Sequence, residues 1–256
     1  MESSLEAIRY LASSVNRVEV LTALADGRAT RRELQEDANG SRSTVSRILD
    51  EAQGQGWVDS EGSRYWLTPL GQAMMGDFRS YLEAVEGLQH LGRTVNQFPP
   101  PLRSLDSRHL RDAVVVEPTE EDPAAPYTRA FDLFREATEY RGLTHTALPD
   151  YSRVLRDGLE QDRIDFEHVL ERAFLETIRT DPRRAAVWRD LSDRVWLYDG
   201  VVPINVHVID ELVLVWLGEN RGEMAGLLLS ENPAVVTWAE SLYAGYRSES
   251  EPLGEL

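Results

Sequence analysis

The chain of 256 residues contains no cysteine and no lysine. Without cysteine there is neither a disulfide framework nor a thiolate metal site. No run of about 18 apolar residues occurs, so no membrane span is expected. The first residues, Met1 to Glu6, are acidic and have neither the basic nor the apolar region of a signal peptide. These absences predict a cytoplasmic protein. A hydrophobic content of 42% with six tryptophans is ample for buried cores.

Charge is distributed unevenly along the chain. Because lysine is absent, all 27 basic residues are arginine, and they stand against 44 acidic residues for a net charge of −17. Acidity without lysine resembles the composition of proteins from salt-accumulating archaea, where salt reduces the Debye length to about 3 Å. Residues 28–47 hold five arginines and three acids, a local charge of +2, whereas residues 101–256 hold 17 arginines and 30 acids. A low isoelectric point argues against nucleic acid, but the distribution of charge matters more.

The positive window coincides with a pattern of two short helices joined by a turn at Asn39 and Gly40. Thr30 and Glu33 have the spacing of a capping box at the start of the first helix. The second helix begins at Ser41 or Ser43. Its buried face is predicted to consist of Val45, Ile48, Leu49 and Ala52. Its other face carries only cationic and small polar residues, as a helix that enters a DNA groove does: Arg42, Ser43, Thr44, Ser46 and Arg47.

The flanking segments complete a recognisable order of elements. Residues 4–26 are amphipathic with helical spacing, and Ser13 and Ser14 interrupt the pattern. Residues 57–58 and 65–68 read as two short strands, and the turn-rich segment 59–64 lies between them. A helix, a helix-turn-helix and a β-hairpin follow one another in a winged helix.

Residues 14–76 resemble the winged helix-turn-helix of archaeal and bacterial regulators of the ArsR, MarR and TrmB type. The resemblance is carried, in order, by Asn16-Arg17, Glu33-Leu34, Ser43-Thr44-Val45-Ser46-Arg47, Gly56-Trp57-Val58 and Leu67-Thr68-Pro69-Leu70-Gly71. It implies double-stranded DNA as a partner. Arg31 and Arg32 would then anchor phosphate, the polar face of the second helix would read the major groove, and Arg64 would reach the adjacent minor groove or backbone. The alternative is a winged helix that contacts only protein.

A long helix is predicted from Thr68 to about Gln97, and residues 98–101, Phe-Pro-Pro-Pro, end it. Its apolar residues recur at nearly heptad spacing: Met74, Phe78, Tyr81, Leu82, Val85 and Leu88. Such a seam needs a partner. We expect pairing with the same helix of a second subunit, because a two-fold dimer matches a palindromic DNA site. Packing on the second domain is the alternative.

The remainder alternates strand and helix patterns with short loops, which indicates a sheet layered by helices. Strands are predicted at 113–116, 140–146, 164–170, 195–197, 204–209, 212–217 and 225–229. Helices are predicted at 127–138, 151–161, 173–178, 184–193 and from Asn232 to about Arg247. Hairpins are expected near Asp210 and near residues 219–221, and the acidic tail from Ser248 is expected to be loose.

Residues 113–246 resemble, by pattern more than by motif, the phospholipase D-like sensor halves of TrmB-type regulators. Phospholipase D chemistry uses a histidine two residues before a lysine, and this chain has no lysine. The nearest imitation, His109-Leu110-Arg111, precedes the first strand of the domain in a polar segment. No phosphate-binding glycine loop, HExxH or GxSxG motif is present. No catalytic residue, metal ligand or cofactor is therefore predicted.

A small-molecule effector remains an open expectation for this domain. His145 lies at the carboxyl end of the predicted strand 140–146, where open α/β sheets bind ligands. A structural, hydrogen-bonded histidine is an equally good interpretation. The candidate ligand-binding residues are Tyr127, Thr144, His145, Thr146 and Asp199.

The sequence thus predicts an α+β chain. Its parts are a winged helix-turn-helix (1–72), a linking and dimerisation helix (73–100), an α/β regulatory domain (101–248) and an acidic tail (249–256). We expect a sequence-specific, homodimeric transcriptional regulator of a halophilic archaeon, without enzymatic activity. Two alternatives remain: an α/β domain that only contacts proteins, and a phospholipase D-like enzyme with an accessory winged helix.

Overall fold

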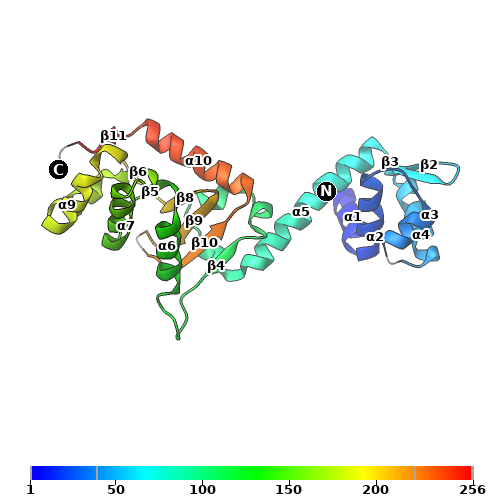
Figure 1. The fold of residues 1–256 in the computed structure, drawn as a ribbon. Coiled ribbons are helices and arrows are strands. Elements are labelled where there is room, and N and C mark those ends of the chain that lie inside the picture. Colours follow the sequence, from blue (N-terminus) through cyan, green and yellow to red (C-terminus); the bar gives the residue numbers. More distant parts are fainter. Residues whose placement is uncertain (1, 39, 222, 255–256) are drawn as a thin grey trace. The chain divides into compact units, whose positions relative to one another are not determined.

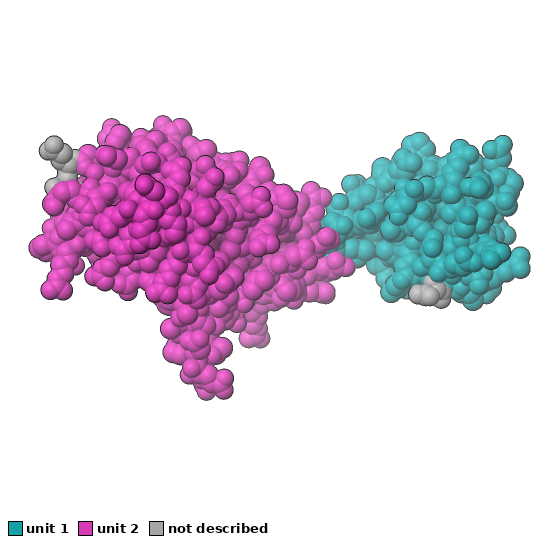
Figure 2. Space-filling model, viewed as in Figure 1, with its two compact units in different colours: residues 1–83 teal, residues 84–256 magenta. Residues whose placement is uncertain are grey.

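The computed structural model describes residues 2–38, 40–221 and 223–254. The chain divides into two compact units, Met1–Glu83 and Ala84–Leu256 (Figure 2). The first unit is mainly helical and the second is built on a large sheet (Figure 1). The predicted fold class, a helical amino-terminal domain followed by an α/β domain, is confirmed. Asn39 of the predicted turn lies outside the described residues.

The first unit has the predicted order of elements. Its helices are α1 (Glu2–Ala12), α2 (Val15–Ala25), α3 (Arg31–Asp37), α4 (Arg42–Gly54) and the first part of α5 (Pro69–Leu91). Its strands β1 (Ala29–Thr30), β2 (Val58–Glu61) and β3 (Arg64–Leu67) form an antiparallel sheet in the order β1-β3-β2. The break predicted at Ser13 and Ser14 separates α1 from α2.

Caps and one apolar face fix the two central helices. The Thr30 backbone N–H donates to Glu33 Oε2 at 2.6 Å, and the Glu33 N–H donates to Thr30 Oγ1 at 3.3 Å, which completes the predicted capping box. Ser41 Oγ accepts the Thr44 N–H at 3.2 Å. The buried residues of α4 are the predicted ones: Val45, Ile48, Leu49 and Ala52. Burial of this stripe turns the polar face of α4 outward.

The α5 helix ends earlier than predicted. It runs from Pro69 to Leu91, and the 3-10 helix η1 (Gly92–Gln97) replaces its last predicted turns. Gly92 adopts a φ of +55°, a left-handed conformation that favours glycine and ends an α-helix. Just before this end, Gly87 lies so close to η3 (Ser107–Leu110) that a Cβ would be 2.2 Å from the Ser107 carbonyl oxygen.

The second unit contains an eight-stranded mixed sheet in the order β11-β7-β6-β5-β8-β9-β10-β4. The strands are β4 (Val114–Val116), β5 (Glu139–Thr144), β6 (Asp165–Glu171), β7 (Val195–Tyr198), β8 (Val206–Ile209), β9 (Leu212–Leu217), β10 (Gly226–Ser230) and β11 (Glu251–Pro252). β5, β6 and β7 are parallel, and the other pairings are antiparallel. The predicted hairpins join β8 to β9 and β9 to β10.

Helices cover both faces of this sheet (Figure 1). One face packs against α6 (Ala125–Glu136), α7 (Pro149–Glu160), α8 (Leu175–Arg179) and α9 (Pro182–Asp190). The other face packs against α10 (Pro233–Ser248), which Asn232 caps by accepting the Ala234 N–H at 3.0 Å. Alternate residues of the central strands therefore enter two different cores. None of the described helices combines the length and the apolar character needed to cross a membrane.

The carboxyl-terminal segment corrects one expectation. Glu251 and Pro252 form β11 on the edge of the sheet beside β7, and Leu253 is buried. Glu251 also pairs with Arg172 at 2.9 Å. The prediction of a loose tail is wrong for these residues. Acidic composition alone predicts a solvated tail, whereas burial of Leu253 holds this segment at the sheet edge.

Candidate functional site

The exposed face of α4 carries the residues that were predicted to read DNA. Arg42, Ser43 and Arg47 are exposed, and Thr44 and Ser46 are half-buried. The hydroxyls of Ser43 and Thr44 lie 2.8 and 2.9 Å from Ser41 Oγ, so they also belong to the amino-terminal cap of the helix. No large apolar side chain interrupts this face.

A solvent-open cleft of about 610 Å³ lies between the start of α3, the start of α4 and the β2–β3 turn. Its basic residues are Arg31, Arg32 and Arg42. Gly62 at the tip of the turn adopts a φ of +63°, which favours glycine. Two segments that are separate in the sequence, the starts of α3 and α4, thus bring positive charge to one concave surface, and the β2–β3 turn closes its third side. A polyanion is the ligand that such a surface favours.

Most of these arginines form weak ion pairs at the surface. Arg31 lies 3.6 Å from Asp50, Arg32 lies 3.0 Å from Glu36, and Arg47 lies 3.6 Å from Glu51. Exposed pairs of this kind are worth about 0–1 kcal/mol, so a phosphate competes readily for the guanidinium. Within the described ranges, Arg42 and Arg64 make no recorded ion pair.

Sequence reasoning overlooked two polar residues of the cleft, Gln35 and Ser63. Gln35 follows Arg31 and Arg32 by one helical turn, so helical spacing would have placed it beside them. Ser63 forms the turn with Gly62. Arg64, predicted at the wing tip, is exposed on β3 and is not part of the cleft lining.

The predicted dimerisation seam of α5 divides into two stripes. Phe78 is buried in the core of the first unit, and Met74 and Leu82 pack partly against that core. Tyr81 and Leu88 are 62% and 45% exposed, and Val85 between them is half-buried. The first stripe, Met74, Phe78 and Leu82, thus packs within the first unit. The second stripe, Tyr81, Val85 and Leu88, is spaced by four and three residues and includes two exposed apolar side chains.

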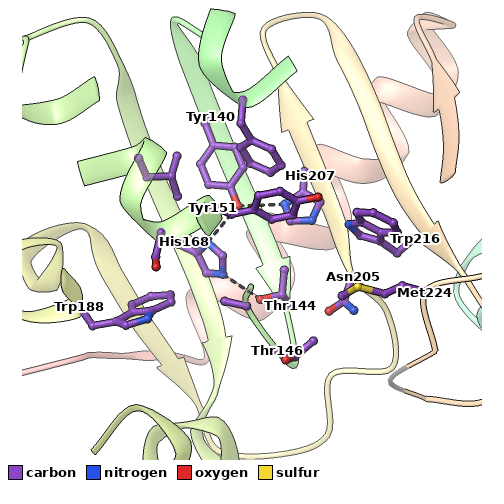
Figure 3. A pocket seen from close by; sticks show the side chains of 14 residues that line it. Tyr140, Thr144, Thr146, Tyr151, His168, Trp188, Asn205, His207, Trp216 and Met224 are labelled. Carbon is purple, nitrogen blue, oxygen red and sulfur yellow. Dashed lines mark hydrogen bonds between the residues drawn. The ribbon is translucent and has the colours of Figure 1, made fainter. Parts of the chain in front are cut away.

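In the second unit, one row of side chains crosses three central strands. Tyr140, Gly142 and Thr144 lie on the same face of β5, and Gly142 is in register with His168 on β6 and His207 on β8. The Tyr140 hydroxyl lies 3.0 Å from Nδ1 of His168 and 2.9 Å from Nδ1 of His207 (Figure 3). Gly142 makes this possible, because a Cβ there would be 2.0 Å from that hydroxyl.

This histidine–tyrosine–histidine row is uncharged. Burial lowers the pKa of both His168 and His207 to about 3, and burial raises the pKa of Tyr140 well above its ordinary value. The Tyr140 hydroxyl can donate to one Nδ1 while it accepts from the other. Thr144 Oγ1 lies 2.9 Å from Nε2 of His168 and completes the chain of hydrogen bonds. At neutral pH neither imidazole is protonated, so neither supplies positive charge to a phosphate.

The row forms one wall of a cavity of about 20 Å³, which Phe134 of α6 also lines. Tyr151 of α7 and Trp188 of α9 line it as well (Figure 3). That volume holds roughly one water molecule. Of the five predicted ligand residues, Thr144 and Thr146 line the cavity. The other three lie elsewhere.

Their positions differ. Tyr127 contacts Trp216 with ring centroids 5.0 Å apart and ring planes tilted by 40°, and it is itself 36% exposed. His145 lines an adjoining cleft, and burial lowers its pKa. The Asp199 side chain is 85% exposed, lies 3.6 Å from Arg172 and lines neither space.

Sequence reasoning missed the most buried residues of the row. Tyr140, His168 and His207 are each under 5% exposed. The available signal was a histidine in the middle of an apolar strand, as in Val206-His207-Val208, and the period-two spacing of Tyr140, Gly142 and Thr144. Neither histidine stands two residues before a lysine, so the phospholipase D motif gives no signal at these positions. In the described part of the chain, no group of three or more His, Asp or Glu residues is placed to hold a metal ion.

Two family models match separate parts of the chain. The model for the HVO_A0261 N-terminal domain matches residues 5–90. The model for the middle domain of the methanogenesis regulatory protein FilR1 matches residues 123–249. Each match covers less than half of the chain, and the two fall largely on the two compact units. The second unit is therefore similar to a domain of a regulatory protein. A search of curated protein sequences found no match.

Solved structures share features of the fold at low identity. TrmBL2, described as an archaeal chromatin protein, is 13% identical over 97% of this chain and 100% of its own, with a TM-score of 0.40. Nuc from Salmonella typhimurium, a phospholipase D family member, is 12% identical over 55% of this chain and 98% of its own, with a TM-score of 0.42. NucT from Helicobacter pylori is 11% identical over 56% and 99%, with a TM-score of 0.44. These likenesses are too distant to carry a functional argument.

Proposed function

We propose that the protein is a sequence-specific, DNA-binding transcriptional regulator that acts in the cytoplasm of a halophilic archaeon. One observation carries this proposal: in a chain of net charge −17, Arg31, Arg32 and Arg42 converge on one cleft beside the exposed face of α4. The match of residues 123–249 to a domain of a regulatory protein supports the regulatory part of the proposal.

The helix α4 is proposed to enter the major groove. Arg42 and Arg47, one helical turn and a half apart, would reach base edges or phosphates, and Ser43, Thr44 and Ser46 are short enough to let the helix approach closely. Arg31 and Arg32 would contact the phosphate backbone across the cleft. Arg64 on β3 would contact the flanking minor groove or backbone, as a wing does. Molar salt leaves little gain from counterion release, so base contacts would carry much of the affinity.

A homodimer through α5 is part of this proposal. The apolar stripe of Tyr81, Val85 and Leu88 contains the two exposed residues of the predicted seam, Tyr81 and Leu88, with half-buried Val85 between them. Pairing of this stripe with its copy would bury apolar surface and give the two-fold symmetry of a palindromic site. The second unit would then control DNA binding through a ligand or a partner. It is proposed to be non-enzymatic, since both of its central histidines are buried and hydrogen-bonded to Tyr140 and no lysine is present.

Fluorescence anisotropy with labelled DNA from the gene's own upstream region, in molar KCl, tests DNA binding. We expect Arg42→Ala to weaken binding at least tenfold. Arg9→Ala, at an exposed arginine on α1, removes the same charge away from the cleft and serves as the matched control. Absence of sequence-dependent binding by the unaltered chain would refute the proposal. Equal effects of the two variants would show that only net charge matters.

A further inference from the structure

Glu51, near the end of α4, binds two arginines from different helices. Its Oε2 lies 3.0 Å from Nη2 of Arg17 on α2, and its Oε1 lies 3.6 Å from Nη1 of Arg47, one helical turn earlier on α4. The side chain of Arg17 is only 14% exposed, whereas that of Arg47 is 62% exposed. One carboxylate thus connects the arginine that is proposed to read a base with an arginine in the body of the first unit.

The Arg17 guanidinium is held by further contacts to the segment that precedes α2. Its Nη1 donates to the backbone carbonyl oxygen of Tyr10 at 3.0 Å and to the hydroxyl of Ser13. Its Cζ lies over the Tyr10 ring, 4.1 Å from the centroid, and that ring meets the buried Trp57 edge-on at 5.6 Å. A charge-assisted bond to a guanidinium that is itself fixed leaves the Glu51 carboxylate little freedom.

The neighbouring acid on α4 has no such anchor. Asp50 lies 3.6 Å from Arg31, the same distance that separates Glu51 from Arg47, but its side chain is 67% exposed, against 35% for Glu51. Within the described ranges, Asp50 has no second recorded ion pair. Two freely rotating side chains lose conformational entropy when they pair, whereas Arg47 meets a carboxylate that is already in place. The fold therefore controls the direction of Arg47 more closely than that of Arg31.

We propose that Glu51 is a positioning residue for Arg47. Anchored by Arg17, its carboxylate holds the Arg47 guanidinium beside the polar face of α4, in a direction that favours a base edge. An arginine without this restraint adopts many directions and reaches the phosphates, which carry no sequence information. The negative charge of Glu51 also disfavours a phosphate at the same guanidinium. This inference rests on the proposed function and adds to it the residue that makes Arg47 selective.

Binding selection by the full chain from a randomised DNA library in molar KCl tests this inference. Fluorescence anisotropy then measures the affinity for the selected sequence and for its single-base variants. Glu51→Gln keeps the shape of the side chain and removes its charge. The preference at the base position that Arg47→Ala affects should fall about threefold or more. Asp50→Asn removes the same charge from the adjacent residue of α4 and frees Arg31 instead, so it should leave this preference unchanged.

A double-mutant cycle distinguishes positioning from a general structural effect. In the Arg47→Ala background no guanidinium remains to be directed, so Glu51→Gln should change the affinity for the selected sequence no more than Asp50→Asn does. Glu51→Asp keeps the charge but shortens the side chain by one methylene, so it should relax the same base position. It replaces Glu51→Gln if urea unfolding shows that the latter does not fold.

Three results would overturn the inference. The first is an unaltered base preference in both Glu51 variants. The second is an equal effect of Glu51→Gln with and without Arg47, and the third is the same loss of preference in Asp50→Asn. In each case, selection of a sequence by the unaltered chain leaves the proposed function intact. An unaltered chain that selects no sequence refutes the proposed function itself.

Discussion

Gly142 shows how a single residue determines a site. Its missing side chain leaves room for the Tyr140 hydroxyl between two histidines on the neighbouring strands. The Tyr140 hydroxyl is buried and hydrogen-bonded to both His168 and His207, so it cannot move aside without losing one of these bonds. In the sequence Gly142 looks like an ordinary glycine within a strand. In the fold, packing requires a residue without a side chain at this position.

Gly142→Ala is expected to lower the free energy of unfolding of the second unit by about 1–3 kcal/mol, as overpacking of a core does. Thermal or urea unfolding followed by tryptophan fluorescence measures this change. Gly245→Ala on α10 is the matched control, because a Cβ there meets no atom within 4 Å. Alanine favours helices over glycine, so the control should be neutral or stabilising. Equal stability of the Gly142→Ala variant and the unaltered chain would contradict the tight fit.

Arg47 allows the proposed base-reading role of α4 to be distinguished from simple charge attraction. If Arg47 pairs bidentately with guanine, Arg47→Ala should cost about 1–3 kcal/mol of binding free energy and relax preference at one base position. Arg47→Lys keeps the charge but loses the planar fork, so it should also relax that preference. Binding selection from a randomised DNA library measures both variants. Uniform weakening on all sequences would make Arg47 a phosphate anchor instead.

At the scale of elements, α5 explains why an apolar repeat does not by itself define an interface. Its predicted seam contains two stripes, and the structure packs Phe78 into the first unit while Tyr81 and Leu88 stay exposed. The sequence of this 23-residue helix, with apolar positions on two faces, is compatible both with packing into a domain core and with pairing to a second subunit. Only the packing of the core of the first unit decides which face is left over.

The double variant Tyr81→Glu, Leu88→Glu should reduce a dimer to monomers, because it places four like charges in the paired stripe. Its melting temperature should change little, since both positions are exposed. Light scattering coupled to size-exclusion chromatography in molar KCl measures the mass. Gln89→Glu, an exposed position on the same helix, is the control for added charge. An unchanged mass of the double variant would place the dimer contact elsewhere or remove it.

Elements were more predictable than the sites they build. The strands and helices of the second unit follow periodicity and turn residues, and β5 to β10 lie within a few residues of their predicted bounds. Periodicity reports burial, whereas a cavity depends on which strands become neighbours. His168 and His207 are 39 residues apart in the sequence. They reach the same Tyr140 hydroxyl because β5 lies between β6 and β8 in the sheet. The Thr30 cap and the α4 face were predictable because their contacts are local.

For the whole molecule, the net charge of −17 makes stability depend on salt. Like charges repel in the compact state, and salt reduces the range of repulsion from about 10 Å at 0.1 M to about 3 Å at 1 M. We expect the melting temperature to rise steadily as KCl is raised over this range. Glucose at matched osmolality screens no charge and should raise the melting temperature much less. A melting temperature independent of KCl would contradict the expectation.

Acid should destabilise the second unit through its two buried histidines. Their pKa is about 3 in the folded chain and about 6.5 when unfolded, so between these values the unfolded chain binds more protons. Above pH 6.5 the two histidines are neutral in both states and do not affect the pH dependence of the free energy of unfolding. Below pH 6.5 this free energy falls as the pH drops. The slope should approach about 3 kcal/mol per pH unit for both together.

Urea unfolding between pH 7 and pH 5 measures this slope, because most carboxylates titrate below that window. His168→Gln with His207→Gln should flatten the curve, whereas His109→Gln, outside the cavity, should leave its shape unchanged. A steep curve in the double variant would assign the acid sensitivity to other groups.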